Sequence, residues 1–133
     1  RQPVDGTVPI TGLDDLVPPI QLVPTPANIQ AMGRTFQNPV ARTAESLERG
    51  RDRYDIFCAL CHGAQGAGDG PITAVMPIVP SLVSPQVQGH NDGYIYAIIT
   101  NGRGLMKQYR QRVRSDDRWH IVNYIRILQG IAQ

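Results

Sequence analysis

The stretch Cys58-Ala59-Leu60-Cys61-His62 holds both cysteines of the 133-residue chain, and the interpretation of the whole sequence starts from it. Two cysteines three positions apart on a helix project from one face, about a turn apart. A histidine directly after the second cysteine can reach a metal held on that side. Because this spacing is the attachment pattern of haem c, we predict one haem bonded to Cys58 and Cys61, with His62 as an axial ligand of its iron.

Three other uses of paired cysteines fit the sequence less well. A thioredoxin-like dithiol requires a β-α-β setting, and no strand pattern precedes Cys58. A structural zinc site requires four ligands, and the remaining histidines, His90 and His120, stand at no recognisable spacing. A plain disulfide suits an exported protein but leaves His62 without a role. Haem attachment accounts for both cysteines and the histidine together.

The second axial ligand has several candidates. Met106 follows two closely spaced glycines, which free the backbone to bring a side chain over a flat ring. A thioether suits iron, so Met106 is the preferred ligand, and the rival methionines are Met76 and Met32. A second histidine, His90 or His120, is a further alternative.

A large flat cofactor also fits the composition of the chain. Hydrophobic residues make up 41% and aromatic residues only 6%, so the cofactor would supply part of the missing interior. Its anionic propionates need hydrogen-bond donors, for which the candidates are Arg103, Tyr109 and Trp119. The alternative is that Tyr109 and Trp119 only pack against other side chains and bind no propionate.

Apolar residues at helical spacing predict three helices in the second part of the chain. The first runs from Thr43, a good capping residue, to the cysteines, and the second begins near Asp92 as its cap. The third opens at Ser115 and stops before Gly130. Gly50 costs the first helix about 1 kcal/mol relative to alanine, which indicates a close contact with another helix. No alternation of period two occurs, so we predict an all-α fold.

Two segments lack a helical pattern. Residues 63–85 are rich in glycine and proline and form a predicted loop, of a length that is uncommon unless something functional orders it. Residues 1–42 hold seven of the eleven prolines, which predicts an extended, non-helical arm. Apolar residues in this Pro-rich arm predict an N-terminal extension that packs on the core, which leaves 43–133 as the single domain.

The charge pattern bears on partners. The net charge of +2 gives no reason to expect nucleic-acid binding. One basic stretch nevertheless contains no acid, and its cations are Arg103, Lys107, Arg110, Arg112 and Arg114. If Met106 lies over the haem, these charges flank it and would steer an acidic redox partner.

The sequence also bears on location. No run of about 18 apolar residues occurs, so no segment is expected to span a membrane. The chain starts at Arg1 rather than at a methionine, so we expect a processed form whose export signal or lipid anchor has been removed. The expected location is the periplasm or another extracytoplasmic space, with any membrane association made through such an anchor.

Several of these features together resemble the class I c-type cytochromes. After the cysteines come a glycine-rich segment, the element Pro80-Ser81-Leu82 and an aromatic C-terminal helix, in the order of that family. The resemblance implies the cytochrome c fold, with helices around one covalently bound haem. It implies that the Pro80 carbonyl accepts the second ring N–H of His62. It further implies that the first and last helices cross at a glycine, with the matching set Gly50, Tyr54, Ile121 and Tyr124.

A narrower resemblance lies in the C-terminal half, in the run from Tyr94 to Met106 followed by Asp117-Arg118-Trp119 and Tyr124. This order is similar to the monohaem cytochrome c subunit of alternative complex III and to related soluble electron donors of haem-copper oxidases. One departure is Lys107, where many relatives have proline after the ligand methionine.

That resemblance implies a one-electron carrier of a respiratory chain rather than an enzyme. Its expected partners are a quinol-oxidising complex as donor and a terminal haem-copper oxidase as acceptor. The alternatives are a fixed monohaem subunit of a membrane respiratory complex and a haem enzyme such as a peroxidase.

Overall fold

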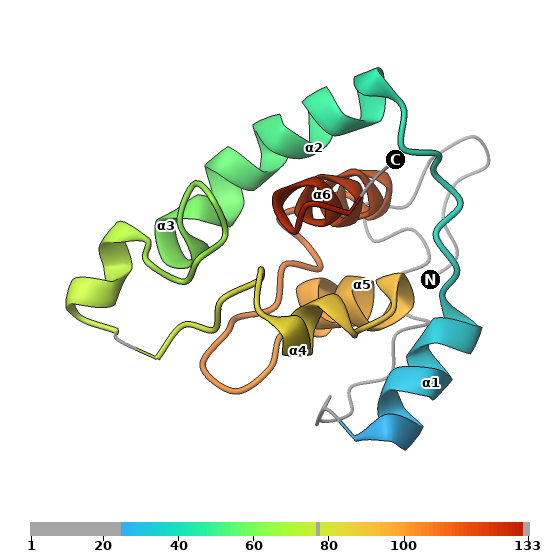
Figure 1. Cartoon of the computed structure of the whole chain (residues 1–133), viewed down its shortest axis with the longest axis horizontal. Coiled ribbons are helices and arrows are strands. Elements are labelled where there is room, and N and C mark those ends of the chain that lie inside the picture. The colour runs from blue at the N-terminus through green and yellow to red at the C-terminus, as the bar shows by residue number, and fades with distance from the viewer. Residues whose placement is uncertain (1–24, 77, 132–133) are drawn as a thin grey trace, which may run out of the picture.

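The structure is a computed structural model that describes residues 25–76 and 78–131 (Figure 1). Helices dominate these residues, and no strand occurs among them, which confirms the predicted all-α fold. The α-helices are α1 (Pro26–Thr35), α2 (Ala44–Phe57), α3 (Ala59–His62), α4 (Pro85–Gln88), α5 (Asp92–Asn101) and α6 (Ser115–Leu128), and a 3-10 helix spans Pro71–Ala74. None of these helices is long and apolar enough to cross a membrane.

Helix α6 lies at the centre of the arrangement (Figure 1). Helix α2 packs on one side of it and α5 on the other, while α1 packs against α5. The shared core is made of buried side chains from α2, α5 and α6, among them Tyr54, Tyr94, Ile95, Ile99, Ile121, Val122 and Ile125. Burying these apolar faces against each other is the main force that holds the helices together.

The predicted close contact at Gly50 is the crossing point of α2 and α6. A side-chain carbon at Gly50 would overlap the backbone carbonyl of His120 and would lie 2.9 Å from the Cβ of Tyr124. One turn further along α2, the Tyr54 ring packs against the Tyr124 ring with a centroid distance of 5.3 Å. Glycine therefore lets the two helix backbones approach more closely than any other residue would allow.

Polar contacts fasten the same two helices near their N-termini. Thr43 caps α2, because its hydroxyl accepts a hydrogen bond from the Ser46 amide at 3.1 Å. The Ser46 hydroxyl contacts His120 Nδ1 at 2.8 Å and accepts from the buried Asn123 amide at 2.9 Å. Asp117 receives two hydrogen bonds from the Arg49 guanidinium, at 2.8 and 3.0 Å. Ser46, Asn123 and Asp117, which are buried in this interface, thus find their hydrogen-bond partners there.

The prediction of an extended arm was wrong for the part of residues 1–42 that forms α1. Pro26 occupies the first turn, where a missing N–H costs nothing, and Thr25 caps the helix by accepting from the Asn28 amide at 3.2 Å. Met32 is 6% exposed and belongs to the hydrophobic core. The described end of the arm therefore packs on the core as a helix, and residues 1–24 lie outside the described residues.

One predicted helix cap differs from the structure, and one predicted helix start agrees with it. The cap of α5 is Asn91, whose side chain accepts from the Tyr94 amide at 2.8 Å, whereas the predicted cap Asp92 accepts from Arg126 at 2.9 Å. Helix α6 begins at Ser115 as predicted, but its cap residue, Arg114, makes no side-chain capping bond.

The Gly50→Ala substitution is expected to destabilise the protein by about 1–3 kcal/mol, although alanine favours helices. The added methyl group would force α2 away from α6, because the His120 carbonyl occupies its place. The free energy of unfolding from denaturant titration of the purified protein measures the effect.

Gly89→Ala is the matched control, since its added carbon would meet only ordinary contacts of 3.4 Å or more and its φ of −76° suits any residue. We expect the control to change stability by less than about 0.5 kcal/mol. Equal stability of the two variants would contradict a close crossing at Gly50.

Candidate functional site

The two cysteines and the histidine lie where α2 passes into α3. Cys58 is the residue between the two helices, and its amide donates to the Tyr54 carbonyl at 2.8 Å. The His62 amide donates to the Cys58 carbonyl at 2.9 Å, so the three predicted site residues share one helical turn. Both thiols are free and half-buried. Burial raises the pKa of the Cys58 thiol to about 12, with the neighbouring Cys61 as the smaller cause.

The imidazole of His62 is buried and held in one orientation. Its Nδ1 lies 3.2 Å from the Pro80 carbonyl oxygen, the contact that the family resemblance implies. A carbonyl can only accept, so Nδ1 carries the proton and donates, which leaves the lone pair on Nε2. Among the described residues, Nε2 has no hydrogen-bond partner. Burial lowers the pKa of His62, and the contact with Pro80 opposes this shift.

The glycine-rich segment brings Pro80 back to His62. The Gly68 amide donates to the His62 carbonyl at 2.8 Å, and the Leu82 amide donates to the Gly66 carbonyl at 2.7 Å. Gly68 has a φ of +80°, and a side-chain carbon there would lie 2.7 Å from the Val79 carbonyl oxygen. Only glycine permits both this backbone conformation and this close approach. The predicted long loop is therefore ordered by its own backbone hydrogen bonds.

Tyr54 anchors this segment, a role that the sequence did not reveal. Its side chain is fully buried, and its hydroxyl donates to the Gly63 carbonyl at 2.6 Å. Burial raises the pKa of Tyr54 well above its ordinary value. No local pattern marks such a residue, because the contact joins the core face of α2 to a loop that starts after α3.

Met106, the preferred second ligand, lies in a tight turn. Arg103 and Met106 pair through both backbone hydrogen bonds, at 3.1 and 2.9 Å, and Gly104 between them has a φ of +58°. The Met106 side chain is half-buried. Its rival Met76 is also half-buried, two residues after the end of the 3-10 helix, whereas Met32 is a core residue of α1. Met106 as the second ligand stays a prediction.

The candidate propionate donors lie in different surroundings. Tyr109 lies near the first cysteine, since its ring contacts the ring of Phe57, the residue before Cys58, edge-on with a centroid distance of 6.4 Å. Burial, and then the proximity of Cys58 and Cys61, raise the pKa of Tyr109. Trp119 stacks on Tyr96 with ring centroids 4.0 Å apart and planes 10° apart, which is the packing role weighed for it. The exposed Arg103 lies beside the Tyr94 hydroxyl. The structure thus brings Tyr109 to the cysteines and places Trp119 between α5 and α6.

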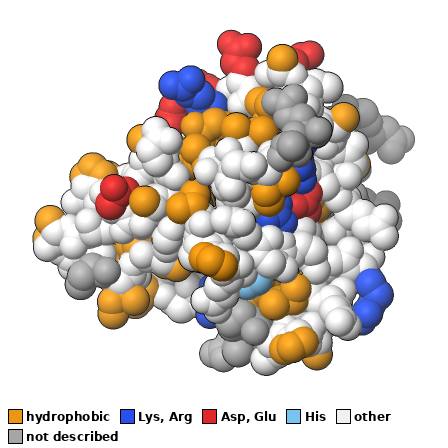
Figure 2. Space-filling model, viewed as in Figure 1, with side chains coloured by type: hydrophobic (Ala, Val, Ile, Leu, Met, Phe, Trp, Pro, Cys, Tyr) orange, Lys and Arg blue, Asp and Glu red, His pale blue; other side chains and the backbone are white. Residues whose placement is uncertain are grey.

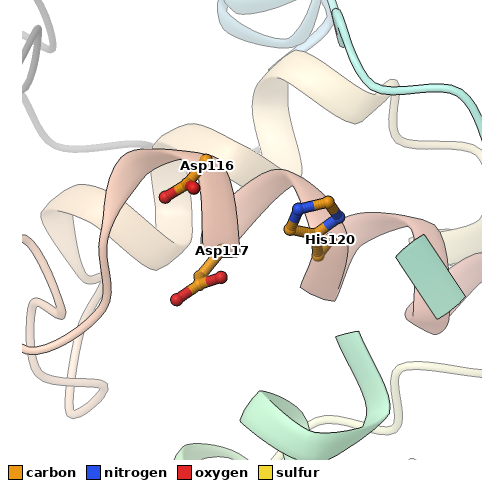
Figure 3. A group of neighbouring side chains, drawn as sticks. All are labelled: Asp116, Asp117 and His120. Carbon is orange, nitrogen blue, oxygen red and sulfur yellow. The ribbon is translucent and has the colours of Figure 1, made fainter. Parts of the chain in front are cut away.

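A second cluster of polar side chains lies on the first turns of α6 (Figure 3). The ligand atoms of Asp116, Asp117 and His120 lie within 4.8 Å of one another. Asp117 is already bound by Arg49, and His120 is bound by Ser46. The cluster therefore joins α2 to α6, and His120, a minor alternative for the second ligand, has one ring nitrogen engaged there.

Exposed hydrophobic side chains gather at the end of the molecule formed by α3 and the segment that follows it (Figure 2). Ile56, Leu60, Val75 and Ile78 are each more than half exposed, and Leu105 beside Met106 is 68% exposed. Single exposed apolar residues are ordinary, but several around one motif indicate a surface that binds something.

These residues fit a covalently bound haem c. Two free thiols on one helical turn suit attachment to two vinyl groups, and the adjacent imidazole presents an unprotonated nitrogen. The backbone carbonyl on the other ring nitrogen orients the imidazole, as outer contacts of metal-bound histidines do. Half-buried and exposed apolar groups around the motif match a flat hydrophobic cofactor.

Three solved structures have a fold similar to that of the present chain, and two of them are cytochromes. A chain of the reducing HAO-like protein complex of Kuenenia stuttgartiensis matches with a TM-score of 0.59 and 23% identity, over 68% of the present chain and 46% of its own. Cytochrome cL of Hyphomicrobium denitrificans matches with a TM-score of 0.55 and 23% identity, over 85% of the present chain and 64% of the cytochrome. Cytochrome cL of Methylophaga aminisulfidivorans matches with a TM-score of 0.57 and 17% identity, over 86% of the present chain and 81% of the cytochrome.

The present chain spans less than two thirds of the first two of these proteins, and identities this low show the fold alone. A search of curated proteins found no significant match. The profile of one family, described as cytochrome c oxidase, cbb3-type, subunit III, matches residues 45–125, which include the whole of α2, α3, α4 and α5 apart from one residue. The chain therefore belongs to this cytochrome c family of electron carriers and contains covalently bound haem c.

Proposed function

We propose that the protein is a monohaem c-type cytochrome that carries single electrons between a quinol-oxidising complex and a terminal haem-copper oxidase. The observation that carries this proposal is the arrangement of His62, whose Nδ1 is held by Pro80 and whose Nε2 is left available beside two free thiols. The narrower resemblance to the monohaem subunit of alternative complex III supports the choice of partners.

Each residue of the site has a separate role. When bound, haem c supplies an iron that takes up and releases one electron. Cys58 and Cys61 hold the cofactor covalently, and His62 binds the iron in the orientation set by Pro80. Met106 would supply the second ligand of the iron from its turn, which would leave no open site for a substrate. The protein is thus an electron-transfer protein and not an enzyme.

The basic stretch is the proposed docking surface for an acidic partner. Arg103, Lys107, Arg112 and Arg114 are exposed, and Arg110 is half-buried. The Arg112 guanidinium lies 5.7 Å from the centroid of the Tyr109 ring, which in turn borders the cysteines. Positive charge is therefore close to the cofactor, where it would accelerate encounter with an acidic surface.

A fixed subunit of a membrane respiratory complex is the second candidate function. The description of the matching family, an oxidase subunit, favours it. In either case the proposed location is the periplasm, with any membrane association made through an anchor or a partner. Gel filtration and membrane fractionation of the native protein distinguish a free carrier from a subunit.

Covalent attachment is tested by mass. Under denaturing conditions, the purified native protein is expected to keep its colour and to exceed the polypeptide mass by one haem, because both thiols form thioether bonds. Cys58→Ala and Cys61→Ala are each expected to hold haem through one bond or not at all. A colourless native chain with the bare polypeptide mass would disprove the proposed function.

The second ligand is tested by a matched pair of variants. The oxidised protein is expected to show the near-infrared band of methionine bound to haem iron. Met106→Ala should abolish this band, and Met76→Ala, which removes the rival methionine, should preserve it. Loss of the band in Met76→Ala alone would transfer the ligand role to Met76.

The docking surface is tested by salt. The rate of electron transfer to an acidic partner is expected to fall about tenfold or more as the Debye length shrinks from ~30 Å at 0.01 M to ~8 Å at 0.15 M salt. Arg112→Gln should flatten this dependence, whereas Arg51→Gln, which removes an exposed charge from α2, should not. A rate that stays constant or rises with salt would contradict docking through the basic stretch.

A further inference from the structure

The Gln129 side chain joins the end of α6 to the segment that carries Pro80. Its Nε2 donates to the Leu82 carbonyl at 2.8 Å, a contact between residues 47 positions apart that we call the tether. The Leu82 amide is engaged as well, since it donates to the Gly66 carbonyl at 2.7 Å. Both backbone groups of Leu82 are therefore held, two residues after the carbonyl that contacts His62.

Gln129 is itself held by both its backbone and its side chain. It follows the last residue of α6, and Gly130 after it has a φ of +75°, so that the amides of the next two residues donate to helix carbonyls at 2.9 and 3.0 Å. Arg126 holds the side chain, because its Nη1 donates to Gln129 Oε1 at 2.9 Å. Since a guanidinium can only donate, the amide must turn its N–H groups toward Leu82.

Arg126 is fixed within the helical core. Its side chain is 5% exposed, and its Nε donates to the Asp92 carboxylate at 2.9 Å. The same guanidinium donates to the backbone carbonyls of His90 and Gln88. A planar guanidinium holds several acceptors in a fixed relation to one another. The position of Gln129 is therefore determined by the packed helices and not by the glycine-rich segment to which it binds.

We propose that Gln129, oriented by Arg126, is a positioning residue that fixes the axial histidine through residues 80–82. The inference rests on the proposed function, since it requires haem iron bound by His62. The contact between His62 Nδ1 and the Pro80 carbonyl measures 3.2 Å, so a small shift of the segment would break it. This hydrogen bond makes the imidazole a more basic ligand, which favours the oxidised iron. Loss of the tether should therefore raise the reduction potential.

The reduction potential of the holoprotein tests the tether. Gln129→Leu keeps a side chain of similar size but loses the N–H donor, so the Pro80 carbonyl is free to move away from His62. The equilibrium constant for reduction is expected to rise about threefold, a shift of about 28 mV at 59 mV for each tenfold change. A potential equal to that of the native protein would overturn the proposal.

Gln88→Leu is the matched control. It removes the same chemical group, whose Nε2 donates to the Val83 carbonyl at 2.9 Å, next to the tethered residue. That contact is exposed and spans only five residues, so it does not connect the segment to the core. We expect the control to keep the native potential, because the tether to Leu82 is intact. A rise of equal size in Gln88→Leu and Gln129→Leu would contradict a specific role of Gln129.

A second variant tests the orienting role of Arg126. Arg126→Lys keeps the charge beside Asp92, but one ammonium group cannot bind this carboxylate and Gln129 together. We expect the potential to rise, by less than in Gln129→Leu. The double variant should match Gln129→Leu alone, because both changes act through the Leu82 carbonyl. Additive shifts of the potential would contradict this common route.

Exchange of the His62 ring proton provides a readout other than the potential. In the native holoprotein the Nδ1 proton is buried and bonded to Pro80, so it should exchange slowly with deuterium in NMR spectra. Gln129→Leu should accelerate this exchange about tenfold or more, and Gln88→Leu should not. The free energy of unfolding is measured for each variant, and a loss of stability with native exchange and native potential would overturn the positioning role.

The same measurements separate this inference from the proposed function. A native protein without covalent haem disproves the proposed function itself. Covalent haem, together with a native potential and native exchange of the His62 proton in Gln129→Leu, disproves the tether alone.

Discussion

The close crossing of α2 and α6 is the constraint on which the rest of the structure depends. The absence of a side chain at Gly50 lets the two backbones meet, and the contacts of Ser46 with His120 and of Arg49 with Asp117 fasten them. Helix α2 leads directly into the cysteines, so its position against the core determines where they lie. The site is thus the rigid end of a packed helix pair rather than a feature of a free loop.

The helices around that crossing could be predicted from local signals. Thr43 caps α2, Ser115 begins α6, and the core buries several of the periodic apolar residues of both helices, among them Tyr54, Trp119, Val122 and Ile125. Helix α1 was missed because proline was taken to exclude helices, although Pro26 stands in the first turn, where proline is favoured. The α5 cap was misplaced by one residue, since Asn91 and Asp92 are both good caps and only the tertiary contact with Arg126 separates them.

At the site, too, local motifs could be predicted from the sequence, whereas contacts between distant residues could not. The motif Cys58 to His62 identified the cofactor, because its spacing is itself the chemistry of attachment. The contact between His62 and Pro80 was implied only by family resemblance, as eighteen residues separate the two partners. The hydrogen bond from the Tyr54 hydroxyl to the Gly63 carbonyl could not be predicted, since it joins the core face of α2 to the loop that follows α3. Sequence patterns indicate which residues are neighbours along a helix, but they say little about contacts between residues far apart in the sequence.

The buried phenol of Tyr54 has a consequence for the behaviour of the fold in alkali. In the folded protein its hydroxyl stays protonated above the ordinary pKa of tyrosine, because it is buried and donates to the Gly63 carbonyl. In the unfolded chain the same group ionises at its ordinary pKa, so raising the pH beyond that value favours unfolding. The group that holds the glycine-rich segment to α2 is therefore also a built-in upper limit on the pH range in which the cytochrome stays folded.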